Sequence, residues 1–228
     1  MIYKDIEYTY KTSKRKTASV YIERDGSVSL IVPDGFDVPQ VEEVIEAKRA
    51  WIYKGLAEWQ SLNSARVKRE YVNGESFLYL GKSYRLEKVP VKEQQEPLKL
   101  GDEHFYLLDY QSVDPAKVFE GFYRKEAKKV LKERVDLYKK QMGLEPAQIK
   151  VMALQNRWAS CSVNGNLNFH WKCLMAPLSV IDYIVVHELA HLRQPTHNEA
   201  FWNEVDKVLA DYQERKAWLS QHGASMEL

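Results

Sequence analysis

The sequence has very little cysteine. Two residues, Cys161 and Cys173, stand in a chain of 228 residues, which is too few for the disulfide framework that holds many small secreted domains together. We therefore expect two free thiols and a reducing, cytoplasmic location. The fold must depend on a hydrophobic core, and a chain of this length with 45% apolar residues can build one.

The sequence also lacks a long apolar run. No stretch approaches the roughly 18 residues that span a bilayer, and the opening MIYKDIEYTYKTSK has no apolar segment typical of a secretory signal. We expect no membrane partner.

A large excess of charge of either sign is missing too, because the formal net charge is only +1. The molecule as a whole therefore does not attract nucleic acid strongly. Two stretches, 11–16 and 123–134, are locally basic, but a hairpin tip and a solvated helix face explain them. Nucleic acid stays open as a partner but is not favoured.

Strand-like alternation and turn signals predict an α+β fold. The first portion, residues 1–110, is rich in strand signals and contains one helical pattern at 38–62. A linking helix is predicted at 115–142, ending at Gly143, and it opens a second domain at residues 111–228. The polar segment 87–105 is interpreted either as a long hairpin or as a domain boundary.

A hairpin is predicted in the second domain, where Asn164-Gly165 suits a two-residue type I′ turn. This register places Ser160 opposite Phe169.

Two helices should follow the hairpin. The first is predicted to begin with a capping box formed by Ser179 and Asp182 and to stop soon after Arg193, because Pro195 follows. The second is predicted to begin at Asn198 as N-cap.

The segment HELAHLRQPTH, residues 187–197, holds three of the six histidines. On a helix, His187 and His191 lie about 40° apart and one turn above each other, so both imidazoles can reach one metal ion. Glu188 lies nearby without being a ligand. The helix is apolar around most of its circumference and should be buried, and a buried carboxylate needs a partner. The alternative is a buried helix with ordinary hydrogen-bonded histidines.

His197 is the expected third ligand, because Pro195 lets the chain turn back toward the same ion. The rival for this position is Glu199 or a residue further along the second helix. Three protein ligands and a water make an open, tetrahedral site of the catalytic kind. We therefore predict one zinc ion per chain, with Glu188 as general base.

Two stretches together, NRWASCSVNGNLNFHWKCLMAP and IDYIVVHELAHLRQPTHNEAFW, strongly resemble the YgjP-like metallopeptidase domain, a relative of the SprT-like and WLM zincins. The resemblance implies a zincin-like core, zinc held by His187, His191 and His197, and Glu188 as base. It departs at Ala159, where the family usually has glycine.

Four other residues near the cluster admit two interpretations each. Arg157 and Trp158 are candidates for substrate binding, with Arg157 stabilising an oxyanion. Equally, they can be a structural bridge and a core residue. Cys161 is more simply a small buried residue than a nucleophile or ligand, and His170 is more simply a surface or supporting residue than a ligand.

These features predict a zinc-dependent hydrolase, most simply a metallopeptidase acting on a peptide or protein substrate. One alternative is a nucleotide pyrophosphatase at the same site, favoured if Arg157 or Arg193 lines the cleft. Another is a module that docks DNA or a protein partner around a structural metal. The sequence does not indicate the oligomeric state or the particular substrate.

Overall fold

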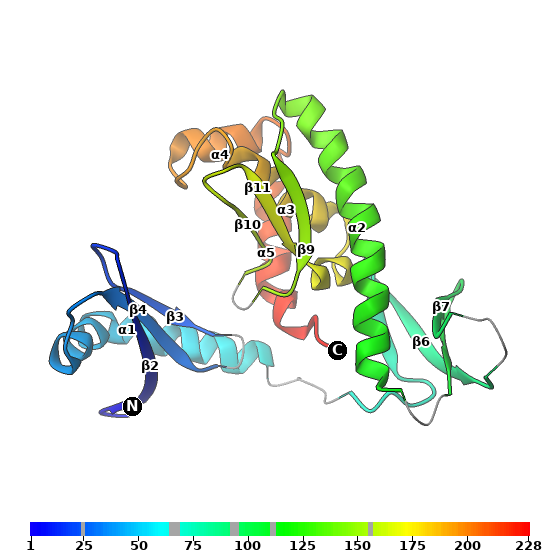
Figure 1. Cartoon of the computed structure of the whole chain (residues 1–228), viewed down its shortest axis with the longest axis horizontal. Coiled ribbons are helices and arrows are strands. Elements are labelled where there is room, and N and C mark those ends of the chain that lie inside the picture. Colours follow the sequence, from blue (N-terminus) through cyan, green and yellow to red (C-terminus); the bar gives the residue numbers. More distant parts are fainter. Residues whose placement is uncertain (24–25, 64–68, 92–95, 110–112, 155–156) are drawn as a thin grey trace. The chain divides into compact units, whose positions relative to one another are not determined.

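The computed structural model describes residues 1–23, 26–63, 69–91, 96–109, 113–154 and 157–228, with side chains left out at 58–63. The chain forms two compact units, Met1–Arg66 and Val67–Leu228. Figure 1 labels the helices and many of the strands. Among the described residues, no helix is long and apolar enough to cross a membrane.

The first unit is a mixed four-stranded sheet with one helix. Strand β2 pairs in parallel with β4, and the sheet order is β1-β2-β4-β3. Alternate strand residues and one face of the helix are buried in a separate core. The helix confirms the pattern predicted at 38–62. The elements are β1 (Ile2–Tyr3), β2 (Ile6–Ser13), β3 (Ser19–Ile22), β4 (Val28–Pro33) and α1 (Val38–Asn63).

The second unit begins with another four-stranded sheet, in the order β5-β6-β8-β7. Strands β7 and β8 form an antiparallel hairpin, while β6 pairs in parallel with β8. The segment 87–105 is therefore not one long hairpin, although residues 92–95 lie outside the described part. The elements are β5 (Ser76–Tyr79), β6 (Lys82–Val89), β7 (Leu98–Leu100) and β8 (His104–Leu108).

Helix α2 (Pro115–Met142) matches its predicted limits. The Asp114 side chain accepts a hydrogen bond from the Ala116 N–H at the start, and Gly143 ends the helix with a φ of 63°, a left-handed conformation that favours glycine. Phe119 of this helix stacks on Phe77 of the preceding sheet at 4.3 Å. Because the sheet and α2 share one core, the two units divide after residue 66 and not at the expected boundary between 110 and 111.

A three-stranded sheet, three helices and two short 3₁₀ turns complete the second unit. Strand β11 pairs in parallel with β9 and antiparallel with β10. Helix α3 packs against α2, α4, α5 and β10. These elements are β9 (Gln148–Met152), β10 (Ala159–Cys161), β11 (Asn166–His170), η1 (Trp171–Met175), α3 (Leu178–Ala190), α4 (Glu199–Asp206), α5 (Tyr212–His222) and η2 (Gly223–Ser225).

The register predicted for the β10–β11 hairpin is wrong by one residue. Ser160 lies opposite Asn168 and not Phe169. The loop is longer than a type I′ turn, because Ser162 hydrogen-bonds across to Asn166 and Gly165 adopts a φ of 75°. A three-residue loop with a left-handed glycine explains this register. Both cysteines are free thiols, as expected.

Both predicted ends of the helix that carries the histidines are also wrong. Its N-cap is Pro177 with no side-chain cap, and Asp182 instead forms an ion pair with Arg134 of α2. The helix ends at Ala190, before Arg193. The backbone tightens there, because the N–H groups of residues 192 and 193 donate to carbonyls three residues back. Asn198 is the N-cap of α4, as predicted.

Candidate metal centre

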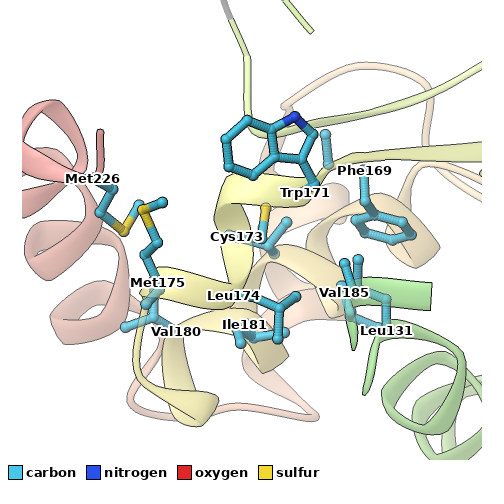
Figure 2. Packing of buried hydrophobic residues seen from close by; sticks show 14 of the residues in the cluster. Leu131, Phe169, Trp171, Cys173, Leu174, Met175, Val180, Ile181, Val185 and Met226 are labelled. Carbon is cyan, nitrogen blue, oxygen red and sulfur yellow. The ribbon is translucent and has the colours of Figure 1, made fainter. Parts of the chain in front are cut away.

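Helix α3 is held in the core of the second unit. Figure 2 shows apolar side chains of α3 clustered with side chains of α2, β11 and η1. Ten of its thirteen residues are buried, which confirms the expectation from the apolar circumference. A helix fixed on all sides presents His187 and Glu188 in one orientation, because neither can move without disturbing close-packed neighbours.

Three imidazoles converge at the end of α3. His187, His191 and His197 each offer one ligand atom, and these atoms all lie within 4.8 Å of one another. The Nε2 atoms of His187 and His197 are 3.0 Å apart. No other group of three potential ligands occurs among the described residues. Glu199, the rival third ligand, is exposed at the start of α4 and does not belong to this group.

The turn after α3 brings His197 back to the helix. His191 Nδ1 lies 3.1 Å from the carbonyl oxygen of Gln194, within this turn. Because a carbonyl only accepts hydrogen bonds, Nδ1 carries the proton and Nε2 keeps its lone pair. The Asn198 side chain then accepts a hydrogen bond from the Phe201 N–H and starts α4 directly after His197. The turn thus fixes both the tautomer of one imidazole and the position of another.

The Phe201 side chain supports the three imidazoles from α4. Its buried ring lies 4.9 Å from the ring of His187, 4.6 Å from that of His191 and 4.7 Å from that of His197. This ring limits the rotamers of the imidazoles without offering any of them a hydrogen bond.

Glu188 is a buried carboxyl group in the same helix. Burial raises its pKa to about 8, although the positive charge of Arg157 and a hydrogen bond from the Cys161 backbone act in the opposite direction. Its Oε2 atom is buried without a hydrogen-bond partner among the described residues. Such an atom is costly to leave unpaired, so the site is built to receive a polar group.

Two of the three histidines, His187 and His197, have lowered pKa values. Burial lowers the pKa of His187 to about 3, and the nearby His191, His197 and Lys216 lower it further in that order. The same first cause, burial, lowers the pKa of His197. Neutral imidazoles are the form that ligates metal ions.

The residues at this site fit a divalent metal ion. Three imidazoles with converging nitrogen atoms form a donor set that suits zinc. The His187 Nδ1 atom is buried without a partner among the described residues. A cation bound at Nε2 would leave the proton of this imidazole on Nδ1. His197 is exposed, and Glu188 directly follows the first histidine in the chain.

Arg157 and Trp158 lie in the segment directly before β10. Arg157 is exposed, and its charge acts on Glu188 as described above. Trp158 is partly buried. Its ring packs so closely on Gly223 that a Cβ atom at that glycine would lie 3.0 Å from the ring. Arg157 thus lies near enough to Glu188 to act on its charge, whereas Trp158 packs beside Gly223.

Cys161 is half-buried and not fully buried as expected, and His170 is buried and so is not a surface residue. Burial, with a smaller contribution from the charge of Glu188, raises the pKa of the Cys161 thiol, which makes it a poor nucleophile. His170 is buried, and its Nδ1 atom accepts a hydrogen bond from the Lys172 N–H at the start of η1. Neither belongs to the ligand group.

An aromatic and basic flank of the site was not predicted as functional. The Trp202 ring stacks on that of Tyr212 at 5.4 Å, and Lys216 lies over the Trp202 ring. Tyr183, one turn before His187, contacts that imidazole at 5.8 Å between ring centroids. Helical spacing from His187 could have indicated Tyr183. Nothing in the sequence indicated Lys216, which comes from a helix with no motif.

Comparison with known proteins identifies a family. The family model described as "YgjP-like, metallopeptidase domain" matches residues 16–222. No curated protein matches the chain significantly.

Two solved structures are similar over part of the chain. One is the metallopeptidase zymogen abylysin of Pyrococcus abyssi, with 25% identity, a TM-score of 0.37, and 39% of this chain and 90% of that chain covered. The other is the metallopeptidase zymogen jannalysin of Methanocaldococcus jannaschii, with 20% identity, a TM-score of 0.37, and 40% and 94% covered. Similarity at this level adds nothing to the argument about the site.

Proposed function

Because the chain belongs to the YgjP-like metallopeptidase family, we propose that it is a zinc-dependent peptidase whose site is the cluster at the end of α3. The observation that carries the proposal is the convergence of three imidazoles, with a buried Glu188 oxygen that has no partner among the described residues directly after the first of them in the chain. Metal ligands beside a general base are the two parts that peptide hydrolysis by water requires.

In this proposal, His187, His191 and His197 hold one zinc ion per chain. Bound zinc would polarise the scissile carbonyl and lower the pKa of a water molecule. Glu188 accepts the proton of the attacking water at Oε2 and later donates it to the leaving amine nitrogen. Its raised pKa suits this exchange, because a base that also acts as an acid works best with a pKa near the working pH.

Arg157 and Trp158 are proposed to bind substrate at the β10 edge. The exposed guanidinium of Arg157 would donate hydrogen bonds to a substrate oxygen that gains negative charge in the transition state. Trp158 would contribute apolar contact area beside it.

Two other functions remain less well supported. A nucleotide pyrophosphatase would need cations for the phosphates. Arg193 is bound by Glu204 and by the Met142 carbonyl oxygen, whereas the charge of Arg157 acts on Glu188, so the family match is what favours a peptidase. A docking module with a purely structural metal would not explain why a carboxyl group is buried beside the ligands without a partner.

The test is elemental analysis of wild-type, His191→Ala and Glu188→Gln proteins prepared without chelators and supplied with zinc. We expect about one zinc per chain in the wild type and in Glu188→Gln, and little in His191→Ala. Cleavage of a labelled peptide library should be seen in the wild type and fall by roughly a thousandfold or more in Glu188→Gln, which keeps its zinc.

Absence of metal from all three proteins would overturn the hydrolase proposal. Zinc in all three proteins would remove His191 from the ligand set. Equal cleavage by wild type and Glu188→Gln would remove Glu188 as the base.

A further inference from the structure

Lys216 presents an ammonium group on an aromatic surface. It is an exposed residue of α5, the helix that packs against α3. Its Nζ atom lies 4.6 Å from the centroid of the Trp202 ring in α4. This is a cation–π distance, so the ring holds the ammonium in a defined place instead of leaving it to move freely in water.

The Trp202 ring connects this ammonium to the three imidazoles. It stacks on the His197 ring at 5.7 Å with an interplanar angle of 26°, and it lies 5.9 Å from the ring of His187. Tyr212 stacks on it as well and restricts its rotation. One indole therefore contacts both the presumed ligands and the ammonium group.

The ammonium group of Lys216 lies one aromatic ring away from the imidazoles. The Trp202 ring contacts both this group and the rings of His187 and His197. Lys216 is not part of the ligand group. Its charge therefore adds to the positive field of the site without occupying a ligand position.

Two carboxylates of this region are paired with other cations. Glu204 of α4 pairs with Arg193 and Lys207, and Asp211, the N-cap of α5, pairs with Arg215. Within the described part of the chain, no ion pair joins a carboxylate to Lys216. An ammonium group placed on a ring, with no carboxylate neutralising it, is suited to bind an anionic group from outside the protein.

We propose that Lys216 and Trp202 form a carboxylate-binding subsite beside the histidine triad, which selects peptides that carry an acidic group close to the scissile bond. The proposal rests on the proposed peptidase function. Lys216 would donate a charge-assisted hydrogen bond to the carboxylate, and the exposed part of the Trp202 ring would pack against the apolar part of the same residue. The carboxylate can come from an Asp or Glu side chain or from the free C-terminus of a peptide.

A purely structural role for Lys216 makes a different prediction. In that case its side chain only covers the Trp202 ring and stabilises the aromatic stack. Lys216→Gln would then lower the melting temperature and leave the choice of peptide unchanged. Peptide choice therefore separates the two roles, whereas stability alone does not.

Binding is best measured in the zinc-loaded Glu188→Gln protein, which does not turn over substrate. Three pools of fluorescein-labelled octapeptides are compared by anisotropy: a neutral pool with a C-terminal amide, the same pool with one glutamate, and the neutral pool with a free C-terminal carboxylate. We expect at least one acidic pool to bind about tenfold more tightly than the neutral amide pool, and the preference to shrink as salt is added.

The second change is then made in the same background. Lys216→Gln should abolish the preference and Lys216→Arg should retain most of it, while Lys128→Gln, at an exposed lysine of α2, should leave it intact. Which acidic pool is preferred identifies the source of the carboxylate. Equal binding of all pools, or a preference that survives Lys216→Gln, would overturn the subsite.

Cleavage by the wild type is scored separately, so that the two proposals can fail independently. If the wild type cleaves peptides but Lys216→Gln does not change the ratio of kcat/KM for acidic and neutral pools, the subsite is wrong and the peptidase stands. If no pool is cleaved but the carboxylate preference depends on Lys216, the peptidase is wrong and the subsite stands.

Discussion

At the scale of single residues, the site depends on which nitrogen or oxygen atom of each side chain is already occupied. The Gln194 carbonyl takes the Nδ1–H of His191 and so leaves its Nε2 available. His187 and Glu188 each keep a buried atom without a partner among the described residues. The sequence predicted these three residues from their helical spacing. It could not predict the tautomer, because the carbonyl involved belongs to a turn whose course is set by tertiary packing.

Asn198 is the residue that couples α4 to the proposed ligand His197. Removing its cap in Asn198→Ala should cost about 1 kcal/mol, because the Phe201 N–H loses its acceptor. For a chain of this size that corresponds to a fall of roughly 2–4 °C in melting temperature. The same variant should bind zinc more weakly, since His197 precedes the cap directly.

Thermal unfolding in a chelator and zinc titration with a competing indicator measure these two effects. Asn198→Ser is the matched control and should keep both properties near wild type, because serine is also a good N-cap. A variant Asn198→Ala with unchanged zinc affinity would show that α4 does not position the ligand.

At the scale of elements, the sequence predicted helices well where side chains define their ends. Helix α2 begins with the Asp114 cap and a proline, and it ends at Gly143, so its limits could be read directly. Helix α3 has no side-chain cap at Pro177, and it ends in backbone bonds that tighten its last turn. Its ends depend on packing, and packing does not follow from a local pattern.

The β10–β11 hairpin shows the same limit. An Asn-Gly dipeptide favours a two-residue turn, but here only Gly165 is left-handed and the loop contains three residues between Ser162 and Asn166. A difference of one residue in the loop shifts every cross-strand pair of the hairpin by one position. The sequence correctly predicted a hairpin with glycine in its loop, but the predicted turn type was wrong.

Arg134 and Asp182 join α2 to α3 by two hydrogen bonds of 2.5 and 2.9 Å. Both side chains are largely buried, with 22% and 10% exposed. Asp182→Asn should cost roughly 3 kcal/mol, because it leaves the guanidinium without its charged partner. Because α3 carries His187 and Glu188, we also expect slower peptide cleavage in that variant.

Denaturant unfolding of single and double variants tests this account. The double variant Arg134→Met with Asp182→Leu should recover most of the lost stability, because replacing both charges with apolar side chains of similar size removes the unpaired charge. If the double variant were as unstable as the sum of the single variants, the ion pair would not be the cause.

At the scale of the whole molecule, the chain holds two cores of unequal size. The first unit has its own small core, and the proposed site lies entirely within the second unit. The sequence suggested a division near residue 110 because of the polar segment before it. The sequence could not reveal that aromatic residues of the β5–β8 sheet pack on α2, because this contact depends on the tertiary fold and not on a local pattern.

This organisation predicts that zinc stabilises only one of the two units. A ligand that binds the folded state stabilises it by about 4 kcal/mol when present at a thousand times its dissociation constant. We expect zinc to slow amide exchange of residues 178–206, which contain the three histidines, and to leave exchange in residues 1–63 unchanged. Hydrogen exchange followed by mass spectrometry, with zinc or with a chelator, measures this region by region.

In His191→Ala, the matched control, zinc should protect neither region, because two imidazoles bind the ion far more weakly than three. Equal protection of both units in the wild type would mean that the ion acts outside the cluster at the end of α3.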